Sequence, residues 1–210
     1  MKHCIKIIAA GLTLAVGAPA IAALTDARQD LGASAQVLQA MEADANISGP
    51  LARARAVLLV PTLADAPNAS ATGVLVMRSG GAWINPVFYD LSGFGAGTQA
   101  RAASGSAAYL LMSDHAVEMF KRSNTFSLTA QSGFSIDGWS ARNTSAPAAD
   151  VIAWSSASDL LPQATAGISA VTADRAENQD YYNRHATPDL IMNREVRDPH
   201  VDELPSVFKE

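Results

Sequence analysis

The sequence GGAWINPVFYDLSGFGAGTQ, residues 80–99, places a short apolar piece between two groups of glycines. The apolar piece, Val87–Leu91, is bounded by turn-forming residues and has the length of a strand, so it predicts a β-strand. The glycines of residues 93–97 lack the G-x-G-x-x-G spacing of a phosphate-binding loop and open no long helix. We therefore expect them to let two strands turn, or to let the backbone approach a neighbour closely.

Short apolar pieces of the same kind recur from Ala54 onward, separated by Gly, Ser, Asn and Pro. This spacing indicates a curved antiparallel sheet or barrel rather than alternating β–α–β units. Besides Val87–Leu91, the expected strands are Ala56–Val60, Gly73–Arg78, Gly97–Arg101, Ala107–Met112, Thr125–Ser132, Val151–Ser155 and Gly167–Thr172.

Residues 25–47 have a different pattern, because Gly32 is their only glycine and they contain no proline. Apolar residues recur at three- and four-residue steps, which predicts a helix ended by Gly49-Pro50. The residues that share its apolar face are Leu31, Ala35, Leu38, Met41 and Ala45. Its polar face is acidic, which favours a helix packed on the core over one lying on a membrane.

The expected fold is a single α+β domain, in which a curved antiparallel or barrel-like sheet packs with this long N-terminal helix and short additional helices. Asp114 can cap one short helix, and Thr187-Pro188 is typical of the start of another. Because Pro199 and Pro205 interrupt the charged residues 194–210, we expect an extended C-terminal tail there.

Composition excludes several classes of protein. The 210 residues are 49% hydrophobic and 17% charged, which excludes a mostly disordered chain. The net charge of −5 is opposite to that of a sequence-independent nucleic-acid binder, so no nucleic acid is expected as a partner.

The first residues are typical of an export signal. Lys2 and Lys6 precede the apolar stretch Ile7–Val16, and Ala20-Ile21-Ala22 offers a signal-peptidase site. The stretch is shorter than the ~20 residues of a membrane-spanning helix. Cleavage after Ala22 removes the single cysteine and lowers the formal charge by two, from −5 to −7. We expect residues 1–22 to be a signal peptide, followed by a domain at 23–193, and the product to be periplasmic or attached to the cell envelope without a transmembrane helix.

Residues with reactive side chains do not form a recognisable catalytic motif. Ser113-Asp114-His115 contains the residue types of a hydrolase triad, but adjacent residues cannot point at one another and no G-x-S-x-G elbow is present. The spacing of His115, His185 and His200 matches no metal motif. Asp137 and Asp159 have no obvious carboxylate partner. We therefore expect neither an enzyme nor a metal or other cofactor.

The run Trp83-Ile84-Asn85-Pro86-Val87-Phe88, continued by Gly97-Thr98-Gln99, resembles the core of the SYLF lipid-binding domain family. In that family a Trp-x-x-Pro-x-Phe element leads into a Gly-rich turn and a Gly-x-Gln strand. The resemblance spans residues 50–192, and the other matching pieces are Ala56–Pro61, Gly73–Arg78, Ala108–Ser113, Gly167–Ser169 and the Asn-x-x-Tyr-Tyr element at Asn178–Tyr182. Of the two tyrosines, we expect one to be buried and one exposed.

Three segments depart from the family pattern. Leu63–Ala71 is shorter than the family's Gly-rich loop and has no glycine, and Thr172 replaces the second glycine of the closing strand. Asp137–Arg142 stands where a Gly-Pro-x-Gly segment is usual.

The resemblance implies a domain that binds phospholipid at a membrane surface and is not an enzyme, and the export signal implies that it is an exported bacterial protein. Eukaryotic members bind phosphoinositides, and some bind actin, partners that an exported bacterial protein would not ordinarily meet. Because the mature chain is acidic, binding would rely on apolar insertion and a local basic patch. The candidate lipid-binding residues are Arg53, Arg55, Arg78, Lys121, Arg122 and Trp139.

Two other functions remain open. A protein-interaction or structural module of the envelope, without a lipid ligand, would show an apolar surface patch. A hydrolase assembled in space would show a deep polar pocket that holds His115 or His185 against a carboxylate.

Overall fold

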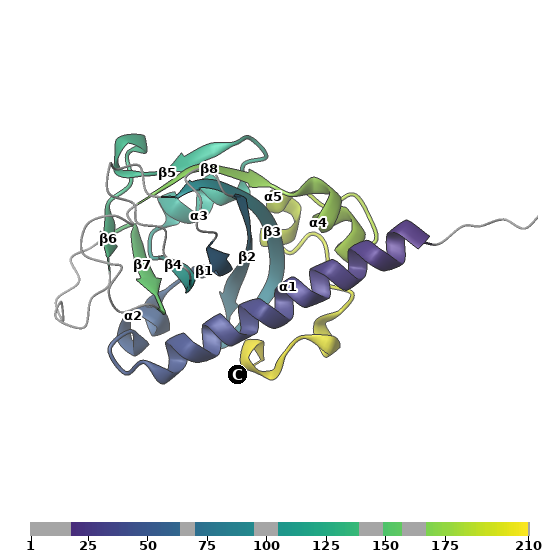
Figure 1. Cartoon of the computed structure of the whole chain (residues 1–210), viewed down its shortest axis with the longest axis horizontal. Helices are drawn as coiled ribbons and strands as arrows, with labels where there is room; N and C mark the ends of the chain where they lie inside the picture. Colours follow the sequence, from purple (N-terminus) through teal and green to yellow (C-terminus); the bar gives the residue numbers. More distant parts are fainter. Residues whose placement is uncertain (1–17, 64–69, 95–104, 139–148, 157–166, 210) are drawn as a thin grey trace, which may run out of the picture.

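Figure 1 shows a computed structural model of the chain, which describes residues 18–63, 70–94, 105–138, 149–156 and 167–209. The helices are α1 (Ala18–Ala43), α2 (Ser48–Arg53), α3 (Asp114–Lys121), α4 (Arg175–Tyr182) and α5 (Pro188–Met192), with 3-10 turns η1 (Ala130–Ser132), η2 (Val201–Glu203) and η3 (Ser206–Phe208). The strands are β1 (Ala56–Leu63), β2 (Ser70–Ser79), β3 (Ala82–Phe94), β4 (Gly105–Leu111), β5 (Phe126–Leu128), β6 (Ile136–Gly138), β7 (Val151–Ser155) and β8 (Ile168–Ala173).

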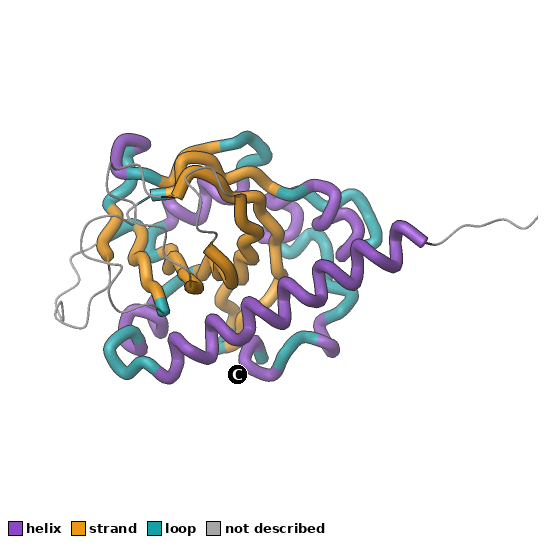
Figure 2. Tube along the Cα trace, viewed as in Figure 1, coloured by secondary structure: helices purple, strands orange, loops and turns teal. Residues whose placement is uncertain are grey.

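The strands of the described residues form one sheet in the order β5-β8-β3-β2-β1-β4-β7-β6. Neighbours pair antiparallel, except for the parallel pair β6 and β7. Figure 2 shows the strands curling around a common centre into a half-barrel. The α+β fold with a curved, barrel-like sheet and a long N-terminal helix is thus confirmed.

Within the stretch quoted in the sequence analysis, residues 80–94 form β3 and the turn that precedes it. Gly80 and Gly81 have φ of 63° and 112° and connect β2 to β3, with Ser79 opposite Ala82. Positive φ at both turn residues is what a two-residue hairpin of type I′ requires, and glycine adopts it without strain. Further along, the register shifts between Leu75 and Met77, where Asn85 (φ 54°) forms a bulge in β3.

Successive residues of β3 show that helices cover both faces of the sheet. The ring of Phe88 lies 5.3 Å from that of Tyr181 in α4, and the ring of Tyr89 lies 5.3 Å from that of Phe120 in α3. Neighbouring residues of a strand point to opposite faces, so α3 and α4 cover opposite sides. Helix α1 runs beside α4 and then along β1 (Figure 1).

The predicted apolar face of the first helix is confirmed for Leu31, Ala35, Leu38 and Met41, which are all buried. Ala45 is an exception and is exposed, because α1 ends at Ala43. The Asp44 carboxylate there accepts a hydrogen bond from the backbone N–H of Asn46 (3.0 Å), a local turn that competes with the helix.

Several strands differ in extent from the sequence-based expectation. Strand β3 is longer than Val87–Leu91, β5 covers only part of Thr125–Ser132, and β6 was not expected. The expected strand Gly97–Arg101 lies outside the described residues.

The C-terminal segment, residues 194–209, packs against the domain, where we expected an extended tail. Leu204, Val207 and Phe208 are buried, and η3 contacts both α1 and β3. Pro199 and Pro205 prevent a regular helix, but the apolar residues that follow them still bury their surface. In the part of the chain that the structure describes, no helix is both long and apolar enough to span a bilayer.

Candidate functional site

Three of the predicted lipid-binding residues meet where α2 ends. The Arg78 guanidinium donates hydrogen bonds to the carbonyls of Leu51 (2.8 Å) and Ala54 (3.2 Å) and lies 4.2 Å from the Trp83 ring centroid. Burial lowers the pKa of Arg78. Arg55 pairs with Asp114 at 2.8 Å, whereas no partner of the exposed Arg53 is seen among the described residues. Arg78 therefore holds helix α2, and of the exposed Arg53 and Arg55 only Arg53 has no acidic partner among the described residues.

Replacing Arg78 by methionine keeps contact with Trp83 but removes the charged donor from the carbonyls of Leu51 and Ala54, of which Leu51 keeps the Ala54 backbone N–H (3.2 Å). We expect the free energy of unfolding to fall by about 2 kcal/mol. Urea denaturation followed by circular dichroism measures this loss. Arg53→Met is the matched control and should change stability by less than about 0.5 kcal/mol, as exposed surface substitutions do.

The remaining predicted residues lie elsewhere. Lys121 pairs with Glu118 at 2.6 Å, and Arg122 is exposed. A guanidinium nitrogen of Arg175 donates to the carbonyl of Ser123 (3.4 Å), which brings a second arginine next to Arg122. Arg175 was not predicted from the sequence, because only the contact between the end of α3 and the start of α4 places it there. Trp139 lies outside the described residues.

A cavity of about 290 Å³ lies between α1, α4 and the C-terminal segment. Leu31, Leu204 and Pro205 give it an apolar wall. Its polar lining consists of Arg28, Tyr181, His200 and Glu203.

The polar lining of the cavity is held by contacts between distant segments. Arg28 of α1 forms an ion pair with Glu203 of η2, and the Nδ1 of His200 lies 3.6 Å from the same carboxylate. The backbone N–H of His200 donates to buried Asp198 (2.8 Å), and the Tyr181 hydroxyl donates to it at 3.4 Å. The other ring nitrogen of His200, Nε2, is buried without a hydrogen-bond partner.

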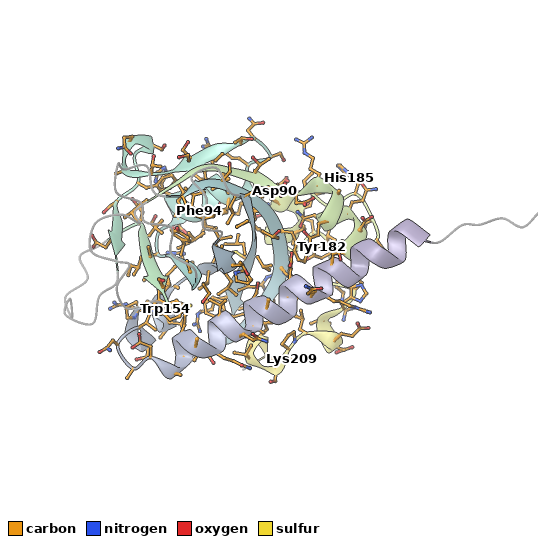
Figure 3. The ribbon with its side chains drawn as sticks, in the orientation of Figure 1. Asp90, Phe94, Trp154, Tyr182, His185 and Lys209 are labelled. Atoms are coloured by element: carbon orange, nitrogen blue, oxygen red, sulfur yellow. The ribbon has the colours of Figure 1, made fainter. Side chains whose placement is uncertain are left out.

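Acidic residues gather on the other side of α1, and we call Asp26, Asp30, Asp90, Asp174 and Glu177 the carboxylate cluster. Asp26 and Asp30 come from α1 and Asp90 from β3, while the other two start α4. Asp174 caps α4 by accepting a hydrogen bond from the backbone N–H of Glu177 (2.9 Å). Figure 3 shows Asp90 on the part of the sheet that lies towards α4.

Burial and repulsion by neighbouring carboxylates raise the pKa of three members of this cluster. Burial, followed by the charges of the other four carboxylates, raises the pKa of Glu177 to about 8. Burial also raises the pKa of Asp30 and of Asp90. One Glu177 oxygen, Oε1, is buried without a hydrogen-bond partner. The Glu177 carboxyl is therefore largely protonated at neutral pH.

The raised pKa of Glu177 predicts a stability that falls with rising pH. The folded protein holds this proton up to about pH 8, whereas the unfolded chain releases it near its ordinary pKa of about 4.3. The stabilising contribution is thus complete below about pH 4 and is lost between there and pH 8. We expect a loss of about 2 kcal/mol, since partial solvent exposure screens the effect.

Chemical denaturation across this pH range measures the effect, and Glu177→Gln should flatten the curve. The pKa of Asp150 is shifted in the opposite direction, because its carboxylate accepts a hydrogen bond from Ser113. A decline in stability below about pH 4 is therefore expected in both the parent protein and Glu177→Gln. An unchanged slope between pH 5 and 8 in Glu177→Gln, relative to the parent, would contradict the assignment.

Comparison with protein families decides what kind of domain carries these features. Residues 92–210 match the profile of the family described as Ysc84, Las17-binding protein actin regulator. This chain belongs to the Ysc84 family. The match confirms the SYLF resemblance, and the family is one of binding domains rather than of enzymes. A comparison with curated proteins found no match.

The Ysc84 match begins within β3, but the fold of the domain begins earlier. Strands β1 and β2 lie between β3 and β4 in the same sheet, so the matched residues cannot form this sheet without them. The earlier part of the resemblance, from Ala56 to Leu91, is therefore part of the same structural unit.

The Asn-x-x-Tyr-Tyr element joins α4 to the sheet of this Ysc84 domain. The Asn178 amide accepts a hydrogen bond from the backbone N–H of Phe88 (3.1 Å) and donates one to its carbonyl (2.9 Å). Both tyrosines are buried, contrary to our expectation, and the Tyr182 hydroxyl donates to the Pro86 carbonyl (2.9 Å). The reason is that α4 lies flat on β3, which leaves neither ring facing solvent.

Of the triad-type residues Ser113-Asp114-His115, Ser113 caps helix α3, whereas we expected Asp114 to be the cap. The Ser113 hydroxyl accepts a hydrogen bond from the backbone N–H of Ala116 (3.2 Å) and donates to the Asp150 carboxylate (2.5 Å). The exposed His115 stacks on Phe134, with ring centroids 5.0 Å apart. The hydroxyl that a hydrolase would use as a nucleophile is thus bonded to a carboxylate rather than to a histidine.

The other candidate reactive residues do not assemble in the described structure. His185 is exposed, Asp137 belongs to β6, and Asp159 lies outside the described residues. Over the described residues, no group of His, Cys, Asp or Glu side chains is arranged to hold a metal ion.

Proposed function

We propose that this Ysc84-family protein is an exported, non-enzymatic lipid-binding protein of the bacterial cell envelope. The observation that carries the proposal is the family match over residues 92–210. The signal-like sequence of residues 1–22 supports export. N-terminal sequencing of the secreted product should give Ala23 as the first residue, and an uncleaved cytoplasmic product would contradict export.

Two exposed basic sites are the proposed contacts with phospholipid head groups. One is Arg53, at the end of α2, and the other is Arg122 with its neighbour Arg175. Arg55 and Lys121 can add to these sites only by leaving their acidic partners, and Arg78 is occupied within the fold. A basic residue near an anionic surface contributes about 1 kcal/mol, so binding is expected to be modest and sensitive to salt.

The cavity supports the apolar part of the proposal. Its wall of Leu31, Leu204 and Pro205 offers nonpolar surface beside the Arg28 guanidinium, and a lipid has the same combination of an apolar chain and a charged head group. The alternative of a protein-interaction module has less support, because Val201 is the one exposed large hydrophobic residue found in the described chain.

Flotation of the mature protein with liposomes tests the proposal. We expect it to float with vesicles that contain anionic phospholipid at low salt, and less with purely neutral vesicles. Arg53→Glu combined with Arg122→Glu should reduce flotation at least about threefold, whereas Arg184→Glu combined with Arg197→Glu, an equal change of charge at two exposed positions, should not. No flotation with any lipid would overturn the function, and an unchanged double variant would overturn the assigned residues.

A further inference from the structure

One short piece of α1 contributes to both the cavity and the carboxylate cluster. Asp26 and Asp30 are four residues apart and face the cluster, while Arg28 and Leu31 line the cavity. Residues at these spacings lie on two different faces of one helix. A movement of this piece, which we call the α1 arm (residues 26–31), therefore changes the cavity and the cluster together.

The charges that face Glu177 all have the same sign. Those that act on it are Asp26 and Asp30 from α1, Asp90 from β3 and Asp174 from its own helix α4. The nearest arginines of the two helices are engaged elsewhere, since Arg28 pairs with Glu203 and Arg175 bonds to the Ser123 carbonyl. Ionising Glu177 thus adds repulsion across the contact between α1 and α4, because the charged groups that act on Glu177 are all carboxylates.

The α1 arm also has a weak point at its end. Gly32 follows it, and a Cβ at that position would contact nothing within 4 Å. Glycine inside a helix costs about 1 kcal/mol relative to alanine, so the helix bends or frays there more readily. The arm itself buries two residues, Ala27 and Leu31, whereas beyond Gly32 the remainder of α1 is held by a longer buried row that includes Ala35, Leu38 and Met41.

We propose that the α1 arm is a pH-sensitive gate of the cavity. With Glu177 protonated, the arm docks on α4 and β3, and Arg28 and Leu31 close one side of the cavity. With Glu177 ionised, repulsion from Asp26 and Asp30 loosens the arm about Gly32, breaks the Arg28–Glu203 pair and opens the cavity. This inference goes beyond lipid binding and does not depend on which ligand the cavity takes.

Hydrogen exchange of the ligand-free mature protein, followed by mass spectrometry, tests the gate. After correction for the intrinsic pH dependence of exchange, residues 26–31 should exchange at least about tenfold faster at about pH 9 than at about pH 6, while β1 and residues 35–41 change little. In Glu177→Gln, the amides of residues 26–31 should exchange slowly at both pH values. Glu195→Gln, at an exposed site outside the cluster, is the matched control and should behave as the parent protein does.

Gly32→Ala gives an independent test, because it stiffens the hinge without a steric clash. It should reduce the exchange of residues 26–31 at about pH 9 by roughly fivefold, the effect of about 1 kcal/mol. The gate is refuted if Glu177→Gln retains the full pH dependence, or if the arm and β1 open together. Since no lipid is present, failure of this experiment leaves the flotation result intact, and failure of flotation leaves this one intact.

Discussion

Truncating Phe208 to alanine is expected to lower the free energy of unfolding by about 4 kcal/mol, the largest single effect that we predict. Phe208 is fully buried although it stands close to the C-terminus, and its 3-10 turn η3 contacts α1 and β3. The substitution leaves a cavity between the long helix and the sheet, because neither of these elements can move to fill it. Thermal and urea unfolding measure the loss.

Val201→Ala is the matched control for this prediction. Val201 lies in the same C-terminal segment but is exposed, so its truncation should change stability by less than about 0.5 kcal/mol. If Phe208→Ala were as mild as Val201→Ala, the C-terminal segment would not be part of the folded domain in solution.

Replacing Asn178 by alanine is expected to cost about 3 kcal/mol. Strand β8 ends at Ala173, opposite Tyr89, and the Asn178 amide continues the pairing of β3 at Phe88. The Phe88 carbonyl keeps a donor in the variant, because the backbone N–H of Asp174 also bonds to it (3.0 Å). The buried N–H of Phe88 loses its acceptor, and α4 loses its polar attachment to the sheet.

The same denaturation experiments test the Asn178 prediction, with Gln179→Ala as a control at an exposed position of α4. Asn178→Asp adds a specific readout. An ionised aspartate can still accept from the Phe88 N–H but cannot donate to the carbonyls of Phe88 and Asp174. At acidic pH its carboxyl is protonated and can donate, so only there should Asn178→Asp destabilise the protein less than Asn178→Ala does. Equal stability of parent and Asn178→Ala would contradict this role.

Structural features that depend on residues close together in the sequence were predictable from it. The three- and four-residue steps of Leu31, Ala35, Leu38 and Met41 specify a buried helical face, and the short apolar pieces specify a curved sheet. The glycines at 80 and 81 mark the turn into β3. Each of these signals is contained within a few residues, so one sequence is sufficient to read it.

The site could be predicted much less well, because it depends on how elements dock. Nothing near Glu177 in the sequence indicates that Asp30 and Asp90 will face it, since this follows from the path of α1 beside α4. Arg78 has the composition of a surface cation, and only the folded position of the α2 carbonyls gives it a structural role. The apolar residues near the C-terminus were obscured by the charges and prolines around them.

The two edge strands of the sheet also determine how copies of this protein meet at high concentration. Strands β5 and β6 each have three residues, and residues 129–135 connect one to the other. A long, unpaired strand would offer its backbone as a template for fibre growth. The outermost strands of the described sheet are these two short ones, so crowded molecules have little main chain there with which to polymerise by strand addition.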